Sequence, residues 1–332
     1  MIRYLRNLSS TEQVAALFIL VFGVLALASI WQLVTSLRER RHEHHGPERD
    51  AYLARLQDNT RLLQTTWTMV VVFWIGWALG NQAATVLFAF VSFFALREFI
   101  TLSPTHRGDH RGLILVFFVV LPVQYWLVSS RHFDLFTVFI PVYVFLAVPV
   151  VSALGDDPQR FLERNAKLQW GIMVCVFGMS HVPALLLLEF PRRPDRGAFL
   201  VFFLVAVVQT CMLAQHLLAR RWPRTPQAPN ISQSFNWATW LVGVALGGVL
   251  GALLSGITPF NAAQGLGMAL IACISGSLGH LVMKALKRDR GITSWGAQGL
   301  SVTGASGLLD RVDALCFAAP IFFHSVRWIF HL

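Results

Sequence analysis

Charged residues are scarce in this sequence. Asp, Glu, Lys and Arg make up only 13% of the 332 residues, whereas hydrophobic residues make up 55%. A soluble globular domain typically carries about 25% charged residues, so water is not the main solvent of a chain with this composition. Negative charge is the scarcer sign, because 17 acidic residues stand against 27 Lys and Arg residues. The composition therefore predicts a membrane protein and argues against a soluble enzyme.

Cysteine is also rare, and the basic residues form no single patch. The four cysteines lie inside or at the ends of apolar runs and lack metal-ligand spacing, so we expect them to be packing residues. The net charge of +10 comes from residues scattered between the apolar runs. A nucleic-acid-binding protein gathers such charge on one face. We therefore expect no nucleic-acid partner, and we interpret the basic residues as determinants of membrane topology.

Long apolar runs recur along the whole chain. About twenty apolar residues cross a hydrocarbon core about 30 Å thick, and runs of this length are separated by short polar segments. The sequence therefore predicts an all-α, polytopic integral membrane protein with about ten transmembrane helices. The expected helices span residues 14–36, 65–81, 83–100, 112–129, 134–154, 168–189, 197–218, 237–257, 262–283 and 314–332.

Polar segments divide the chain into four expected regions. Residues 1–36 hold an N-terminal transmembrane helix, whose apolar run starts too late and continues too far for a cleavable signal peptide. Residues 37–64 form a polar linker, residues 65–190 a transmembrane helix bundle, and residues 191–332 a C-terminal transmembrane region. If the linker is cytoplasmic, most Lys and Arg residues face the cytoplasm as well, which agrees with the positive-inside rule.

The segment from Gly276 to His324 carries the most informative motif residues. It resembles the signature of phosphatidate cytidylyltransferases, also called CDP-diacylglycerol synthases. That signature has a Gly-Asp step, a Lys-Arg pair, a Lys-Asp pair, a Pro-Gly-His-Gly-Gly loop and a closing Asp-Arg-x-Asp. The matching residues are Gly279, Met283, Lys287, Arg288, Gly291, Ile292, Gly296, Gly304, Gly307, Leu309, Asp310, Arg311 and Asp313. Residues 95–111, 135–149 and 166–188 also look like the bacterial branch of the family, so the resemblance covers most of the chain beyond residue 65.

This resemblance implies a reaction and a set of site residues. Such an enzyme joins the phosphate of phosphatidic acid to the α-phosphorus of CTP and releases pyrophosphate, as a multi-pass protein of the bacterial inner (cytoplasmic) membrane. It implies that Asp310 and Asp313 are catalytic and bind Mg²⁺, with His280 as a third metal ligand in place of a lost aspartate. Phosphate or lipid binding is implied for Lys287, Arg288, Arg311 and Ser232. Anionic membrane lipids are further expected partners, and the sequence leaves a homodimer open.

Several positions of the signature carry different chemistry in this chain. His280 and Ser294 stand where the family has the aspartates of the Gly-Asp step and the Lys-Asp pair, Met212 replaces an upstream aspartate, and Phe235 replaces a phosphate-binding lysine. Two functions therefore stay open: an active cytidylyltransferase, and a non-catalytic relative that binds phosphatidic acid or partners an enzyme of lipid synthesis. A small-molecule transporter is a third alternative, although the sequence lacks the paired broken helices of many transporters.

The candidate site residues also have plainer interpretations. Asp310 and Asp313 are spaced i and i+3 and lie on one face at the start of a helix. Acidic residues at such a place also cap the helix or pair with a neighbour such as Arg311. Lys287 and Arg288 lie near a cytoplasmic helix end, where the positive-inside bias alone would place them. Both interpretations stay open at the level of the sequence.

Overall fold

The computed structural model describes residues 10–39, 79–102, 107–190, 196–222, 224–292, 294–296 and 307–332, and single residues between 60 and 78. The chain separates into two compact units, Met1–Ala78 and Leu79–Leu332. Most of the predicted polar linker and about half of the predicted helix at residues 65–81 lie outside the described residues.

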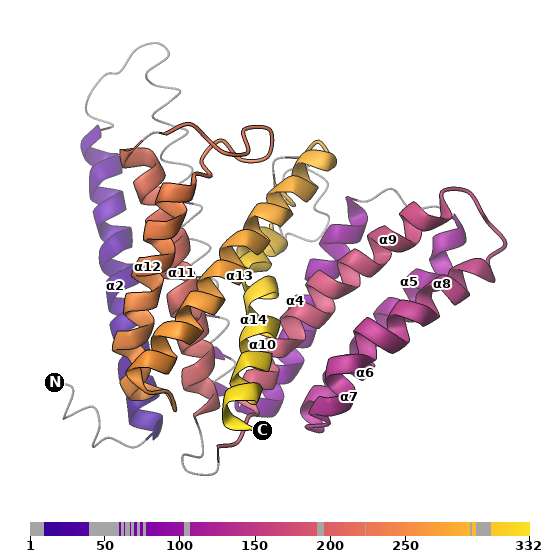
Figure 1. The fold of residues 1–332 in the computed structure, drawn as a ribbon, viewed down its shortest axis with the longest axis horizontal. Helices are drawn as coiled ribbons and strands as arrows, with labels where there is room; N and C mark the ends of the chain where they lie inside the picture. The colour runs from indigo at the N-terminus through magenta and orange to yellow at the C-terminus, as the bar shows by residue number, and fades with distance from the viewer. Residues whose placement is uncertain are drawn as a thin grey trace. The chain divides into compact units, whose positions relative to one another are not determined.

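The first unit contains helix α2 (Ser10–Glu39), which is 30 residues long (Figure 1). At 1.5 Å per residue its length is about 45 Å, which exceeds the thickness of a hydrocarbon core. The indole nitrogen of Trp67 donates a hydrogen bond to Ser29 Oγ over 3.0 Å. The ring of Phe22 lies 5.6 Å from that of Trp67 and 6.3 Å from that of Trp74. Residues of the predicted second helix therefore contact the first helix.

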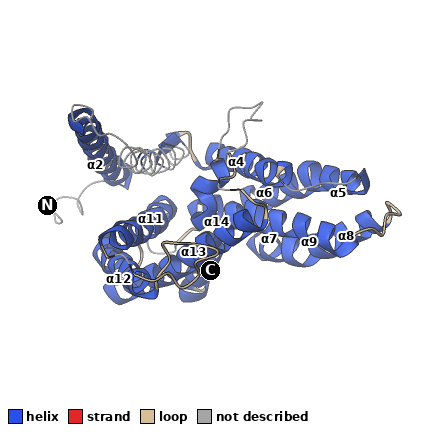
Figure 2. Ribbon diagram, turned by 90° about the horizontal axis from the view of Figure 1, so that it is seen from above, coloured by secondary structure: helices blue, strands red, loops and turns tan. Residues whose placement is uncertain are grey.

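Among its described residues, the second unit has eight helical segments that are long and apolar enough to cross a membrane (Figures 1 and 2). They are α4 (Asn81–Thr101), α5 to α6 (His110–Ser129), α7 to α8 (Phe133–Ala153), α9 to α10 (Phe161–Leu186), α11 (Gly197–Arg221), α12 to η5 (Trp237–Ile257), α13 (Ala262–Asp289) and α14 (Leu308–Phe330). The described part of the chain contains no β-strand. The prediction of an all-α, polytopic membrane protein is confirmed.

Four of these segments combine helices of different geometry. Their parts are α5 (His110–Leu115) after the short η1 (Arg107–Asp109), η2 (Val116–Val120), α6 (Leu121–Ser129), α7 (Phe133–Val138), η3 (Phe139–Val144), α8 (Phe145–Ala153), α9 (Phe161–Gly171), η4 (Ile172–Gly178), α10 (Met179–Leu186), α12 (Trp237–Leu254) and η5 (Ser255–Ile257). The π-helical η2 ends two residues before Pro122, and η3 contains Pro141. Proline lacks an N–H and clashes with the carbonyl one turn earlier, so the wider π turn lets the helix continue through it.

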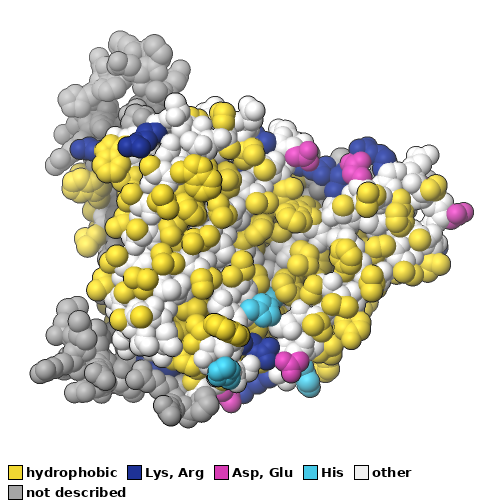
Figure 3. Space-filling view, viewed as in Figure 1, with side chains coloured by type: hydrophobic (Ala, Val, Ile, Leu, Met, Phe, Trp, Pro, Cys, Tyr) yellow, Lys and Arg dark blue, Asp and Glu magenta, His cyan; other side chains and the backbone are white. Residues whose placement is uncertain are grey.

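Apolar side chains cover the middle of the surface of the second unit. Figure 3 shows hydrophobic side chains over most of the visible face, whereas charged side chains gather toward its upper and lower edges. Large residues such as Phe118, Trp126 and Leu253 are exposed by 60% or more. Such an apolar band is what a hydrocarbon solvent requires, because lipid-facing polar groups are costly.

The helices of the second unit form two groups that meet at α14. Helices α11, α12 and α13 pack on one another, and α13 makes its most extensive contact with α14. Helices α4 to α10 form the other group (Figure 1). Helix α14 also packs against α4 and α10 of that group. The C-terminal end of α4, the C-terminal end of α13 and the N-terminal end of α14 lie at the same end of the unit (Figure 1).

Small residues let the C-terminal helices approach closely. A Cβ atom added at Gly251 of α12 would overlap Ala269 of α13, and one added at Gly279 of α13 would overlap Phe317 of α14. Membrane helices associate through such small residues because lipid supplies no hydrophobic driving force between helices. The close contact at Gly279 lies next to the polar ends of α13 and α14, so it positions the site residues of both helices.

Two helices extend beyond their predicted apolar spans. Helix α13 ends at Asp289, six residues after the predicted end of its span, and α14 starts at Leu308, six residues before the predicted start of its span. The apolar runs mark only the hydrocarbon-embedded part of each helix. The polar turns beyond them are helical as well, and they carry most of the candidate site residues.

Candidate functional site

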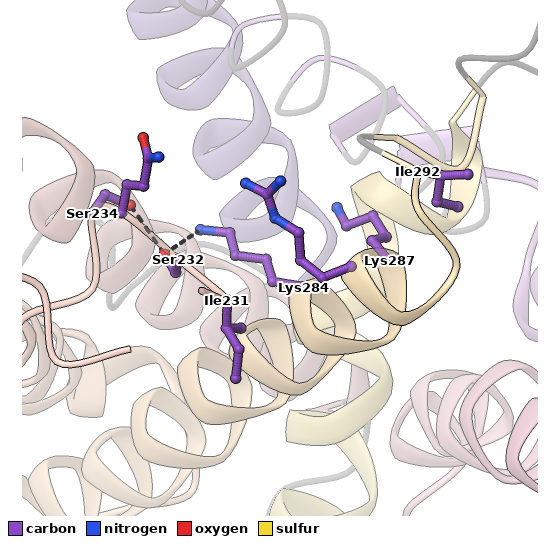
Figure 4. A pocket seen from close by; sticks show the side chains of 8 residues that line it. Ile231, Ser232, Ser234, Lys284, Lys287 and Ile292 are labelled. Carbon is purple, nitrogen blue, oxygen red and sulfur yellow. Dashed lines mark hydrogen bonds between the residues drawn. The ribbon is translucent and has the colours of Figure 1, made fainter. Parts of the chain in front are cut away.

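Three cations lie on one face of the last turns of α13. Lys284, Lys287 and Arg288 are spaced i, i+3 and i+4, which brings them together on the helix surface. A pocket of about 340 Å³ lies between this face and the loop before α12. It is lined by Ile231, Ser232, Gln233, Ser234, Lys284, Lys287, Arg288 and Ile292 (Figure 4).

The loop before α12 is held in place by its own hydrogen bonds. The Asn236 side chain caps α12 by accepting from the N–H of Ala238, and its amide donates to the carbonyl of Thr225 over 2.9 Å. Ser232 is buried, and its Oγ lies 3.5 Å from Nζ of Lys284. Figure 4 shows Lys284 extending toward this serine, with Lys287 farther along the helix. The loop therefore presents a fixed hydroxyl beside the cations.

Asp310 connects α14 to α13 and to the turn that follows α13. Its Oδ1 accepts from Nζ of Lys287 over 2.6 Å. Its Oδ2 accepts from Ser294 Oγ over 2.5 Å and from the N–H of Trp295 over 2.9 Å. The ion pair is largely shielded from solvent, since the side chain of Lys287 is 12% exposed and that of Asp310 22%. Charge-assisted hydrogen bonds of this kind are stronger than neutral ones, so they fix the orientation of Lys287.

Asp313 forms a second pair with His280, one helical turn farther into the membrane. The two atoms joined are Nδ1 of His280 and Oδ2 of Asp313, at 2.7 Å. Asp313 is buried, with its side chain 4% exposed, and its Oδ1 accepts from the N–H of Ala314. Because a carboxylate only accepts hydrogen bonds, Nδ1 of His280 carries the proton that joins the pair.

Glu98 of α4 caps the N-terminus of α14. Its Oε1 accepts from the N–H groups of Gly307 and Leu308 over 2.7 and 3.2 Å, and its Oε2 accepts from the N–H of Leu309 over 2.7 Å. The first N–H groups of a helix have no partner within the helix and favour negative charge. Gly307 has a φ of 80°, which lets the chain turn into the helix. The cap therefore comes from Glu98, and neither Asp310 nor Asp313 supplies it.

The structure brings most of the predicted site residues together, but in pairs. Lys287, Arg288 and Ser232 line the pocket, whereas Arg311 does not. Asp310 pairs with Lys287, and Asp313 with His280. The signature residues Gly304, Ala305 and Ser306 lie outside the described residues. The predicted phosphate-binding set is thus partly assembled at one place.

The predicted magnesium ligands do not form a metal cluster. Among the described residues, no three His, Cys, Asp or Glu side chains come together in a way that could hold a metal ion. Mg²⁺ requires near-octahedral coordination by oxygen. All four carboxylate oxygens of Asp310 and Asp313 instead accept hydrogen bonds from protein groups. As arranged, Asp310, Asp313 and His280 do not fit a magnesium ion.

Glu98 lies at this site, although the sequence alone predicted no role for it there. Glu98 lies about two hundred positions from the helix it caps, and no spacing rule reaches that far. Lys284 lies one turn before the Lys287 and Arg288 pair on the same helix face, so the sequence does group it with these cations. The contact between Lys284 and Ser232 depends on the conformation of the loop before α12. The pattern of apolar residues predicts helices but not the conformation of such a loop.

The chain is similar to a known protein family and to a curated protein. Residues 59–329 match the cytidylyltransferase family. The chain is also similar to YnbB of Escherichia coli (strain K12), which is described as an uncharacterized protein. The two are 33% identical over 273 residues, which cover 81% of this chain and 87% of YnbB. Because the family match extends over most of the chain and includes α13, α14 and their paired side chains, this protein belongs to the cytidylyltransferase family.

Proposed function

We propose that this protein transfers the cytidylyl group of CTP to phosphatidic acid, forming CDP-diacylglycerol and pyrophosphate. The observation that carries the proposal is the basic pocket at the end of α13, in a chain of the cytidylyltransferase family. Within the described part of the chain, no carboxylate pairs with Lys284 or Arg288. Two cations are therefore left to meet an anionic ligand at a helix end where lipid headgroups would lie.

The reaction needs charge stabilisation more than proton transfer. A phosphate oxygen of phosphatidic acid attacks the α-phosphorus of CTP, the bond between the α-phosphorus and the bridging oxygen to the β-phosphorus breaks, and pyrophosphate leaves. Lys284 and Arg288 would bind the phosphates, and Ser232 would donate a hydrogen bond to one of them. Asp310 would hold Lys287 in a fixed orientation toward the same ligand. Such positioning and electrostatic stabilisation carry most of the catalysis in phosphoryl transfer.

We further propose that the protein resides in the bacterial inner (cytoplasmic) membrane with this pocket facing the cytoplasm. The excess of Lys and Arg in the segments at this end supports the orientation. CTP would then reach the pocket from water, and phosphatidic acid would reach it from the surrounding leaflet. Anionic lipids are expected around the same helix ends.

The test is conversion of radiolabelled CTP and phosphatidic acid to CDP-diacylglycerol by the purified full chain. Lys284→Ala and Arg288→Ala should each reduce product formation by about tenfold or more, equal to at least 1.4 kcal/mol of transition-state stabilisation. Lys167→Ala is the matched control, because Lys167 pairs with Glu163 and does not line the pocket. Equal loss in the control, or no product from folded wild-type protein, would contradict the proposal.

The second candidate function is binding of phosphatidic acid without catalysis. It is favoured by the pairs His280 with Asp313 and Ser294 with Asp310, because both occupy positions where the family resemblance leads us to expect aspartates. A folded protein that binds phosphatidic acid but forms no CDP-diacylglycerol would establish this alternative. Product that is lost in Lys284→Ala would exclude it.

A further inference from the structure

We propose that the phosphomonoester site of this protein works without a divalent metal of its own, because protein hydrogen-bond donors and one lysine already occupy the oxygens of the two carboxylates of α14. The inference rests on the proposed function, since it concerns the same pocket. It assigns His280, Lys287 and Ser294 the place that a metal ion would otherwise take beside Asp310 and Asp313.

The first argument is the complete hydrogen bonding of the two carboxylates. Asp310 accepts one charge-assisted bond from Lys287 and two further bonds from Ser294 and the N–H of Trp295. Asp313 accepts from His280 and from the backbone. A buried carboxylate needs either paired cations or a metal to offset its desolvation. Here both oxygens of each carboxylate already have protein partners.

The second argument comes from the atoms at positions 280 and 294. An aspartate at position 280 would bring a carboxylate to the place where Nδ1 of His280 now lies 2.7 Å from Asp313. An aspartate at position 294 would do the same beside Asp310, where Ser294 Oγ now lies 2.5 Å away. Two carboxylates at such distances repel strongly unless a proton or a metal lies between them. Histidine and serine donate hydrogen bonds instead, so they remove the requirement for an ion.

The third argument is the balance of charge around the pocket. Lys287 pairs with Asp310, and His280 is joined to Asp313. Asp313 also attracts Lys284 through space, but neither Asp310 nor Asp313 forms a direct ion pair with Lys284 or Arg288. Those two cations line the pocket with Ser232. A phosphomonoester carries up to two negative charges, and two cations with a hydroxyl donor match it directly. The ligand class is therefore a phosphomonoester, held by side chains alone.

The binding experiment uses the purified full chain and a short-chain phosphatidic acid. Calorimetric titration in EDTA and in millimolar Mg²⁺ should give dissociation constants that agree within about twofold, or less than 0.5 kcal/mol. Weakening of about tenfold or more in EDTA would overturn the inference. Glycerol 3-phosphate is titrated in parallel. Binding as tight as that of the lipid, equally insensitive to EDTA, would support a site for soluble phosphomonoesters, and binding of the lipid alone would support a headgroup site.

Substitutions that restore carboxylates provide the second readout. His280→Asp should create a site that binds Mn²⁺, seen as loss of the free-ion electron paramagnetic resonance signal and as a rise in Tm with Mn²⁺. His280→Asn is the matched control, because its amide can still donate to Asp313 and should bring no Mn²⁺ response. Ser294→Asp repeats the test on a turn outside the helix packing. Stoichiometric Mn²⁺ binding by the wild type that is lost in Asp313→Asn would refute the inference.

The outcomes separate this inference from the proposed function. EDTA-insensitive binding of phosphatidic acid without formation of CDP-diacylglycerol would support the metal-free site and reject the transferase. Formation of CDP-diacylglycerol together with binding that is lost in EDTA would support the transferase and reject the metal-free site. No binding of phosphatidic acid in either buffer would reject both.

Discussion

The cap that Glu98 provides should be the most sensitive structural contact at the site. Glu98→Ala removes the acceptor for three N–H groups at the start of α14. Loss of an N-terminal cap costs about 0.5–2 kcal/mol, and hydrogen bonds to a charged group contribute about 1.5–3 kcal/mol each. Glu98 is only partly buried, so water replaces part of the loss. We expect a decrease of about 2 kcal/mol in the free energy of unfolding.

This loss of stability should be measurable by thermal unfolding, and it should also weaken ligand binding in the pocket. At about 2–4 °C per kcal/mol for a large domain, Glu98→Ala should lower Tm by about 4 °C or more in detergent solution. Glu98→Gln keeps an acceptor oxygen and should recover about half of the shift. Because Asp310 is in the first turn of α14, fraying there should also loosen its hold on Lys287 and weaken phosphatidic acid binding.

The control for this prediction is Glu189→Ala. Glu189 pairs with Arg131, but its side chain is 72% exposed, and exposed pairs contribute about 0–1 kcal/mol. Its removal should leave Tm nearly unchanged. If Glu98→Ala unfolds at the wild-type temperature, the three bonds do not secure α14 and the reasoning about the cap is wrong.

Three further predictions test the scaffold and the pairing of the carboxylates. Gly251→Leu should lower stability by about 1–3 kcal/mol through overpacking of α12 on α13, whereas Gly267→Leu, with open space around it, should have little effect in the same thermal assay. Arg164→Met should cost about 3–5 kcal/mol, because it removes a buried guanidinium that pairs with both Asp109 and Asp157. Arg160→Ala in an exposed pair should cost less than about 1 kcal/mol. Asp310→Asn should lower Tm, because the largely shielded Lys287 loses its carboxylate partner. In the protein that still folds, it should also reduce formation of CDP-diacylglycerol by about tenfold or more, measured with radiolabelled CTP.

Hydropathy predicted the spans well, because the hydrocarbon core imposes a single physical requirement. A segment such as 237–257 has to be apolar along its whole length to lie in lipid, and the helix there has the predicted bounds. Hydropathy does not predict where the helices begin and end. The last turns of α13 contain Lys284 and Lys287, and the first turns of α14 contain Asp310 and Asp313, so the apolar runs stop before the helices do.

The site was predicted as a set of residues but not as a set of contacts. Asp310 and Lys287 were both recognised, yet the spacing of 23 positions between them implies no contact by itself. Their pairing follows from the antiparallel approach of α13 and α14, which depends on a glycine at position 279. Local rules relate residues within about one helical turn. Contacts between residues of different helices can be predicted only when the packing of those helices is known. That packing depends on small residues such as Gly279, and the sequence does not show which helix packs against them.

The pairs between α13 and α14 join the two helices and, on the proposed function, also orient the cations that bind the ligand. His280 with Asp313 and Lys287 with Asp310 join the two helices along their polar ends. A divalent ion in the same place would join them as well, but removal of that ion would leave two buried carboxylates in repulsion. Pairs made of protein groups avoid this dependence, so α13 and α14 keep their register whether or not a ligand is bound. The orientation of Lys284 and Arg288 toward the pocket is then a property of the fold itself. On the proposed function, binding of a phosphomonoester would require no prior ordering of the two helices.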